Sequence, residues 1–311
     1  MASNTGSAST IGLVEPVAAT NREAAEAWSG SLFDRFVKFR DLATAGLGAH
    51  GDEAMRVHPP RPGERALDLG CGFGDTTQQI AALVGPEGEA VGIDVSEPFV
   101  EQARLELEGS GLENVRFMTG DVQVAELEHG FDYAFSRMGI MFFANPVQAL
   151  RNVRQALVPG GRFCAVVWRR KLDNEWVRRA ELVVEEYLEH PEESDEPTCG
   201  PGPFSMADAD TVSEQLRIAG FGEISLRRCD LPLKIGNDLD HAVEFNMSLG
   251  PAGEVLRLWE DRIDELRPKI ASDLREALAE FDGPEGVIAP ASTWIIGARA
   301  PTGGEASAAA Q

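Results

Sequence analysis

The chain has 311 residues, and its 51 acidic side chains outnumber the 28 basic ones to give a formal net charge of −23. A field of that sign repels nucleic acid and anionic membrane surfaces, because both are recognised through lysine and arginine. Neither is expected as a partner, and no membrane span is expected because no apolar run is long enough to cross a bilayer. The four cysteines are far apart and form no C-x-x-C pair, so a reduced, cytoplasmic compartment is expected.

The two ends of the chain differ in composition from the rest. Residues 1–20 carry neither a cationic start nor a continuous apolar run, so they are not expected to be a signal peptide. This segment and the Gly/Ala/Ser-rich tail at 301–311 are predicted to be disordered. Residues 21–300 are predicted to form a single domain.

The first predicted element is a helical cap over residues 21–58. Apolar residues recur there at three- and four-residue steps, as at Trp28, Leu32 and Phe36, and Gly30 is a candidate break. The proline-rich stretch at 58–63 cannot continue a helix, so the cap is expected to end there.

From residue 65 onward, short apolar runs alternate with helical segments. Such alternation is typical of a parallel sheet covered by helices on both faces, so the fold class is predicted to be α/β. Strands are predicted at 66–69, 90–93, 115–118, 133–135 and 163–167. The helices between them are predicted at 75–84, 97–108 and 146–157.

Two helical insertions, at about 169–206 and 236–285, interrupt this regularity after the fifth and sixth strands. The first is predicted to hold an amphipathic helix at 175–190 and an acidic loop at 191–203. The second is predicted to be helical over 239–281, with Pro268 expected to kink or split it. Further along the chain the pattern predicts a helix at 207–219 and strands at 222–231 and 292–298.

The segment ALDLGCGFGDTT, residues 66–77, predicts a strand that enters a glycine-rich turn and then a helix. Gly70 can adopt the positive φ of a sharp turn, while Gly72 and Gly74 let the backbone approach a ligand without a Cβ in the way. The helix N-terminus then directs backbone N–H groups at that ligand. The dinucleotide fingerprint G-x-G-x-x-G/A would need a small residue at Asp75, so a nicotinamide cofactor is disfavoured.

Polar residues also follow the later predicted strands. Asp94 ends the second strand, where a carboxylate could accept both hydroxyls of a ribose. Asp121 follows the third strand, and Ser136 ends the fourth. Each alone could be a helix cap or a surface group, but in this order they favour a ligand site at the carboxyl ends of the strands.

These pieces together resemble the class I S-adenosylmethionine-dependent methyltransferases. The matching motifs are LDLGCGFG, VGIDVS, TGDV, FDYAFSRMGIMFF and LVPGGR, which span about half of the chain. Within that family the chain is most similar to the ubiquinone/menaquinone C-methyltransferase-like group, also called methyltransferase type 11. The resemblance implies S-adenosylmethionine as cofactor and a Rossmann-like, seven-stranded, mostly parallel sheet with an antiparallel last strand.

The resemblance also implies roles for individual residues. Asp68 and the turn at 70–74 would contact the methionine moiety of the cofactor, Asp94 its ribose, and Asp121 with Val122 its adenine. Ser136 and Arg137 would lie at the edge of the cofactor that faces the methyl acceptor. The complete expected cofactor set is Asp68, Gly70, Cys71, Gly72, Gly74, Thr76, Asp94, Val95, Asp121, Val122, Ser136 and Arg137.

The end of the fourth strand narrows the expected acceptor. The sequence SRMG, residues 136–139, has neither the Asn/Asp-Pro-Pro-aromatic motif of many nucleic-acid and protein methyltransferases nor a carboxylate cluster for magnesium. The four cysteines also form no ligand set with histidine, so no metal is expected. A small-molecule acceptor is predicted, in an apolar pocket that includes Phe33, Met138 and Phe142, although core packing explains such residues equally well.

No catalytic residue is assigned. His241 is the only histidine considered as a base, and a solvated helix-end role is favoured for it. The segments outside the core pattern are expected to form a lid over the strand ends, with a homodimer contact as the alternative. Two other functions stay open: a non-catalytic S-adenosylmethionine-binding partner or sensor, and, less favoured, an NAD-dependent oxidoreductase. The choice between C-, O- and N-methylation also stays open.

Overall fold

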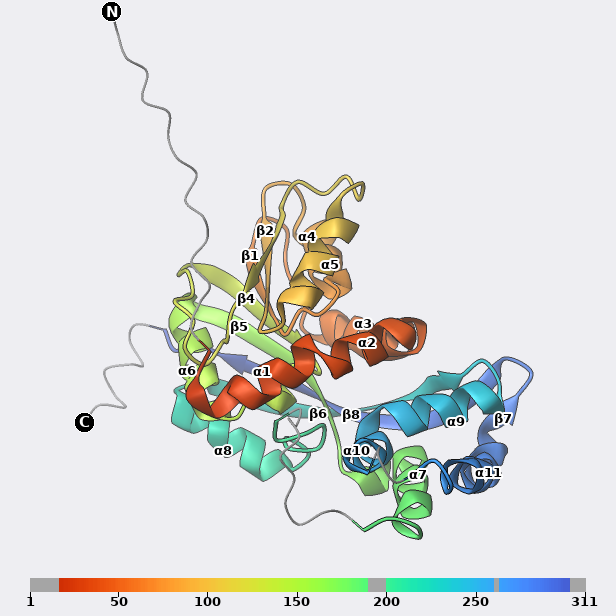
Figure 1. Ribbon diagram of the computed structural model, residues 1–311. Helices are drawn as coiled ribbons and strands as arrows, with labels where there is room; N and C mark the ends of the chain where they lie inside the picture. Colours follow the sequence, from red (N-terminus) through yellow and green to blue (C-terminus); the bar gives the residue numbers. More distant parts are fainter. Residues whose placement is uncertain (1–16, 190–199, 260–262, 303–311) are drawn as a thin grey trace, which may run out of the picture.

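The computed structural model describes residues 17–189, 200–259 and 263–302 (Figure 1). The first 16 residues, the last nine and most of the acidic loop at 191–203 lie outside the described residues. The disorder predicted at the two ends and the loop predicted at 191–203 therefore fall mostly on residues that the structure does not describe.

One mixed sheet forms the centre of the described structure. Its order is β3-β2-β1-β4-β5-β8-β6, with the two-residue β7 paired to β8. All neighbouring pairs are parallel except those that involve β8. The predicted fold class is thus confirmed, including the antiparallel last strand. The strands are β1 (Arg65–Leu69), β2 (Glu89–Asp94), β3 (Val115–Thr119), β4 (Phe131–Arg137), β5 (Leu157–Trp168), β6 (Gly222–Gly236), β7 (Asp282–Gly283) and β8 (Gly286–Arg299).

The strand order changes direction at β1. The chain adds β2 and β3 on one side of β1 and then returns to place β4 on the other side. At such a switch point the connections from the neighbouring strands lead to opposite faces of the sheet, which leaves a crevice at the carboxyl ends of the strands. This position is the natural ligand site of an open α/β sheet.

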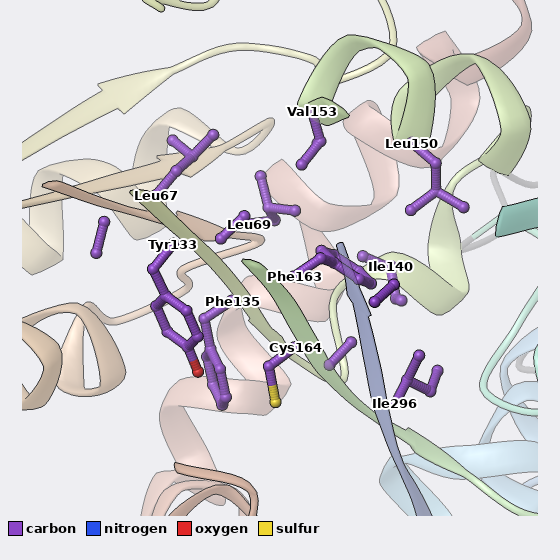
Figure 2. Close-up of a cluster of buried hydrophobic side chains, with 14 of the residues drawn as sticks. Leu67, Leu69, Tyr133, Phe135, Ile140, Leu150, Val153, Phe163, Cys164 and Ile296 are labelled. Carbon is purple, nitrogen blue, oxygen red and sulfur yellow. The ribbon is translucent and has the colours of Figure 1, made fainter. Parts of the chain in front are cut away.

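Helices cover the sheet because its strands are apolar on both faces. Figure 2 shows Leu150 and Val153 of one covering helix directed at Leu67, Leu69 and Phe163, all of them buried. Tyr133 and Phe135 project from the other face of the sheet, and the buried Tyr133 hydroxyl donates to the His58 carbonyl at 2.9 Å. The covering helices are α3 (Leu47–Val57), α4 (Asp75–Val84), α5 (Glu97–Leu107), α6 (Pro146–Ala156) and α8 (Ala209–Ala219).

The remaining helices lie outside this three-layer core. Gly30 separates the first two, as predicted, whereas Pro268 lies in the first turn of a helix and does not kink one. The insertion is thus split just before Pro268, one of the two predicted outcomes, because proline is readily accommodated in the first helical turn, where its missing N–H has no partner to lose. These helices are α1 (Arg22–Ser29), α2 (Ser31–Lys38), α7 (Glu175–Glu185), α9 (Leu239–Ser248), α10 (Gly250–Leu258) and α11 (Arg267–Leu278).

The helices of the two insertions share a second hydrophobic core. Trp176 of α7 and Leu274 of α11 are buried in it, together with Ile235 of β6 and Ala289 of β8. Figure 1 shows these helices gathered where β6 and β8 extend beyond the other strands. The insertions therefore pack on the long strand ends and on each other. None of the described helices is long and apolar enough to cross a membrane.

Candidate cofactor and acceptor site

A cavity of about 920 Å³ lies at the carboxyl ends of β1, β2 and β4. Its walls come from the glycine-rich turn, from α1 and α2, and from the insertion helices α7, α9 and α10. This volume is at the upper end of what a single small ligand occupies. The crevice expected from the strand order is thus present, and the helices outside the core enclose it.

The glycine-rich turn adopts the conformation expected from its sequence. Gly70, Gly72 and Gly74 have φ angles of +66°, +53° and +79°, which side-chain-bearing residues rarely adopt. A Cβ on Gly70 would lie 2.9 Å from the Cα of Gly139, which follows β4. The loops after β1 and β4 therefore touch at the switch point, and Gly70, Cys71 and Gly72 line the cavity.

Asp94 ties this turn to the end of β2. Its Oδ2 accepts from the Gly72 N–H at 2.9 Å and its Oδ1 from the Ser96 N–H at 3.0 Å. Burial raises the pKa of the Asp94 carboxyl, and the hydrogen bonds from the backbone act in the opposite sense. Asp94 and the adjacent Val95 line the cavity, so the carboxylate is held in place before any ligand arrives.

Asp121 lies at another corner of the cavity, next to the N-terminal segment. Its carboxylate accepts from the Gln123 backbone and side chain at 3.0 to 3.1 Å, and from the Ala18 backbone N–H at 3.1 Å. Val122 also lines the cavity. The contact with Ala18 brings residues from the start of the described chain to the end of β3.

Arg137, the last residue of β4, forms an ion pair across the mouth of the glycine turn. Its Nη2 lies 2.6 Å from Oδ2 of Asp75, the first residue of α4. Both residues line the cavity. A cation and an anion are thus held side by side next to the N-terminus of α4.

Five of the residues predicted for the site do not line the cavity. Asp68 and Ser136 are buried behind it, where Asp68 accepts from the Thr77 hydroxyl at 2.6 Å and Ser136 donates to the Leu69 carbonyl at 2.8 Å. Thr76 and Gly74 lie in the buried start of α4 and the turn before it. The ring of Phe33 packs instead against Phe99 and Phe73, with centroids 5.0 and 6.3 Å away.

The apolar residues predicted after β4 do reach the cavity. Met138 and Phe142 both line it. Met138 has a φ of +65°, the left-handed conformation that is uncommon for residues other than glycine. Its N–H donates to the Val166 carbonyl at 2.9 Å, which extends the β4–β5 ladder into the turn. Strained backbone of this kind is often found at functional sites.

Several cavity residues on the outer helices were not predicted individually, although most of them lie in segments that were expected to form the lid. They include Asn21, Trp28, Lys171, Trp176 and Glu181. Trp28 and Trp176 follow the helical apolar pattern, but that pattern does not distinguish a face packed in a core from one that lines a cavity. His241 is not among the lining residues; its ring stacks on Phe39, and its Nδ1 lies 3.3 Å from the Asn237 N–H.

The buried carboxyl of Asp68 is expected to make the free energy of unfolding depend on pH. Burial raises the pKa of its carboxyl from 3.8 to about 7, against the opposing hydrogen bond from Thr77. Between these values the folded chain retains a proton that the unfolded chain loses, so Asp68 lowers stability as pH rises from about 4 to 7. Asp68→Asn is expected to become more stable relative to the parent over that window, by at most about 1.4 kcal/mol per pH unit. Urea unfolding at pH 4.5, 6 and 7.5 would test this, and a constant stability difference would contradict it.

The strand order, the antiparallel β8 and a cavity at a glycine-rich turn together define a class I methyltransferase fold. Residues 60–198, somewhat less than half of the chain, match a family model described as a methyltransferase domain. The predicted resemblance to the methyltransferases is confirmed by this match.

Curated relatives match only part of the chain. A demethylmenaquinone methyltransferase of Bacillus cytotoxicus is 34% identical over 111 residues, 35% of this chain and 47% of the relative. An uncharacterised 37.1 kDa protein in a transposon of Streptomyces fradiae is 45% identical over 103 residues, 33% of this chain and 29% of the relative. The chain thus spans less than half the length of these relatives.

Solved structures share the fold at low sequence identity. The Bacillus YcgJ protein is 18% identical with a TM-score of 0.52, covering 83% of this chain and 99% of that one. A phosphoethanolamine N-methyltransferase of Haemonchus contortus, in complex with phosphomonomethylethanolamine and S-adenosylhomocysteine, is 16% identical with a TM-score of 0.53. That match covers 92% of this chain and 62% of the other.

Proposed function

We propose that the chain is an S-adenosylmethionine-dependent methyltransferase that acts on a small molecule without a metal. The observation that carries the proposal is one continuous cavity, which runs from the glycine-rich turn to the insertion helices. A cofactor at the strand ends and an acceptor among the helices would then meet inside it. Methyl transfer requires that contact.

The residues at the strand ends fit the cofactor. Asp94 offers carboxylate oxygens to a ribose, and the backbone of Gly70 and Gly72 can approach the ligand closely because neither has a Cβ. Arg137 and Asp75 present opposite charges beside the N-terminus of α4, which suits the carboxylate and ammonium of a methionine moiety. Asp121 and Val122 lie where the resemblance places adenine.

The remaining half of the cavity fits an apolar acceptor with a polar group. Its walls are mainly apolar, and they include Trp168, Trp176, Val177, Leu233, Phe245 and Leu258. The ion pair of Lys171 and Glu181 also lines it. Trp176 is only 6% exposed, and its indole contributes part of this apolar wall.

S-adenosylmethionine supplies a methyl group on a sulfonium, so the reaction has a neutral thioether as leaving group. The protein mainly has to align the acceptor with that methyl group and exclude water, and alignment can contribute about 7–11 kcal/mol in favourable cases. The enclosing helices are joined across the cavity: Arg35 of α2 donates to the Ser248 carbonyl of α9 at 3.1 Å, and Lys38 pairs with Glu244. This closure supports the lid role over a dimer contact.

The proposal is tested by turnover with the full chain. S-adenosylmethionine labelled in its methyl group would be incubated with phenols, quinones and amines, and transfer to at least one class is expected. Tight cofactor binding with no transfer to any acceptor would instead favour the non-catalytic binding protein. The three described cysteines, Cys71, Cys164 and Cys229, are free and buried, which supports a reduced, cytoplasmic location for the protein. The assay is therefore run under reducing conditions.

Trp176→Phe is expected to impair use of the acceptor and to spare the cofactor. The substitution keeps an aromatic ring against Phe245 but reduces the apolar surface that Trp176 presents to the cavity. We expect KM for an identified acceptor to rise about tenfold, the effect of about 1.4 kcal/mol of lost apolar contact, with S-adenosylhomocysteine affinity changed less than about twofold. Trp294→Phe is the matched control, because its Nε1 donates to the Ala207 carbonyl outside the cavity lining. Equal effects of the two variants would contradict the assignment.

Methyl transfer is expected to proceed without a divalent metal. In the part of the chain that the structure describes, no three His, Cys, Asp or Glu side chains are grouped so that they could hold an ion. Activity measured after EDTA treatment should equal the untreated activity. A loss that magnesium restores would show that the acceptor site has been misread.

A further inference from the structure

An ion pair lies in the apolar half of the cavity, on the side formed by α7. The buried face of this helix consists of Trp176, Val177, Ala180, Glu181 and Val184. Glu181 places a carboxylate among these apolar residues, with a side chain only 11% exposed. A charged side chain is rarely buried without a partner. The partner is Lys171 of the 3-10 turn Lys171–Asp173, and both residues line the cavity.

Lys171 ends a stretch of three consecutive cations, and the other two are held elsewhere. Arg169 donates to the Ser292 hydroxyl at 2.8 Å, and Arg170 pairs with Asp173 at 2.9 Å. Of these three cations, Lys171 alone lines the cavity. The turn before α7 thus directs one positive charge at the ligand space and retains two for the protein.

The ion pair has hydrogen-bonding capacity left over. An ammonium has three N–H donors, and a carboxylate has two acceptor oxygens. Within the described part of the chain, the pair makes one hydrogen bond, from Lys171 Nζ to Glu181 Oε1. Glu254 of α10 also lines the cavity, but both of its oxygens accept from Arg257, at 2.9 and 3.0 Å. A ligand therefore meets a free donor and a free acceptor side by side at Lys171 and Glu181.

This combination selects a neutral group that both accepts and donates. A carboxylate on the ligand would be repelled by Glu181, and an ammonium would be repelled by Lys171. A hydroxyl avoids both costs, because its oxygen accepts from the ammonium while its hydrogen is donated to the carboxylate.

Aromatic side chains surround the pair. Lys171 Nζ lies 5.9 Å from the centroid of the Phe204 ring. The ring of Trp176 stacks on that of Phe245 and meets that of Trp168 edge-on, with centroids 6.2 and 6.4 Å away. All four aromatic residues line the cavity. Walls of this kind pack favourably against a flat aromatic ligand.

We propose that the Lys171–Glu181 pair selects the methyl acceptor by binding a hydroxyl group on an aromatic ring. The hydroxyl oxygen accepts from Lys171 Nζ, and the hydroxyl hydrogen is donated to Glu181 Oε2. The proposal rests on the proposed function, because it takes this half of the cavity as the acceptor site. The two residues determine specificity by positioning the acceptor.

The test compares three naphthalene probes on the full chain saturated with S-adenosylhomocysteine at pH 7. The probes 2-naphthol, 2-naphthoate and 2-naphthylmethylammonium share one ring system and differ in the charge of the attached group. Titration calorimetry gives the Kd of each. The parent is expected to bind 2-naphthol about tenfold more tightly than either charged probe.

Removal of one charge at a time is expected to change this order in opposite directions. Glu181→Gln keeps the size of the side chain and leaves the Lys171 ammonium without its counter-charge. We expect 2-naphthoate to bind this variant at least as tightly as 2-naphthol, a change of about tenfold or more in the ratio of the two Kd values. Lys171→Met should give the corresponding change in favour of 2-naphthylmethylammonium, and it carries the test if Glu181→Gln does not fold.

Glu254→Gln is the matched control. It removes the same charge from the wall of the same cavity, but the cation that it leaves, Arg257, does not line the cavity. This variant should keep the preference of the parent for 2-naphthol.

The outcomes separate the inference from the proposed function. If the parent binds S-adenosylhomocysteine but none of the probes, or all three equally, the role of the ion pair is overturned and the proposed function stands. An unchanged order of affinities in the folded Glu181 or Lys171 variant overturns it as well. The same change in the Glu254 control would assign the preference to the total charge of the cavity, against the inference. A parent that does not bind S-adenosylhomocysteine would refute the proposed function itself.

Discussion

Asp94→Ala is expected to weaken the binding of S-adenosylhomocysteine roughly tenfold to a hundredfold. The variant would lose the charge-assisted hydrogen bonds between the Asp94 carboxylate and the ribose, which contribute about 1.5–3 kcal/mol. It would also lose the hydrogen bonds that this carboxylate accepts from the Gly72 and Ser96 N–H groups, which hold the glycine-rich turn against the end of β2. Titration calorimetry on the folded variant measures the effect directly.

Asp132→Ala serves as the matched control for this change. Asp132 is also a carboxylate that accepts a backbone N–H, from Arg65 at 2.9 Å, but it lies near the start of β4, at the amino ends of the parallel strands. Asp132→Ala should remove a comparable hydrogen bond between a carboxylate and a backbone N–H, and leave the affinity for S-adenosylhomocysteine unchanged. Asp94→Ala with the affinity of the parent would refute the ribose assignment.

Gly74→Ala is expected to lower the free energy of unfolding by about 2–5 kcal/mol. The new methyl group would lie 2.5 Å from Cζ of Phe117 and 2.9 Å from Cβ of Ala103, both in a buried cluster. Such overpacking costs about 1–3 kcal/mol, and the φ of +79° adds about 1–2 kcal/mol for a residue with a Cβ. Urea or thermal unfolding would measure the loss.

Gly220→Ala separates the two costs of that substitution. Gly220 follows α8 in the same left-handed region, with φ and ψ of 92° and 20° against 79° and 3° for Gly74, but its Cβ would meet only the flexible Arg154 side chain, at 3.0 Å. It should lose only about 1–2 kcal/mol, from the backbone alone. Equal losses in the two variants would mean that close packing around Gly74 does not contribute.

The sequence was sufficient to predict an element where its end signals and its pattern of apolar residues both indicated the same structure. The predicted bounds of α4 match the structure, because positive-φ glycines flank it and its apolar positions keep helical spacing. The sixth strand was predicted to end at Leu231, but β6 continues to Gly236. Pro232 follows the predicted end, and an edge strand such as β6 can hold a proline because one of its sides has no ladder partner.

The site was predictable only where the chain itself brings the residues together. Gly70, Asp94 and Asp121 follow successive parallel strands, so their meeting at one edge of the sheet follows from the topology. Asn21 and Trp176 reach the same cavity through tertiary packing of helices whose orientation no local pattern specifies. The position of Phe33 was unpredictable for the same reason, since the periodicity of α2 does not show that its ring faces Phe73 and Phe99.

Binding of S-adenosylmethionine in this cavity is tested most directly by calorimetric titration of the full chain with S-adenosylhomocysteine, and separately with NAD. We expect saturable one-to-one binding of S-adenosylhomocysteine, and no binding of NAD at the same concentrations. Binding of NAD without binding of S-adenosylhomocysteine would show that the cavity is not an S-adenosylmethionine site.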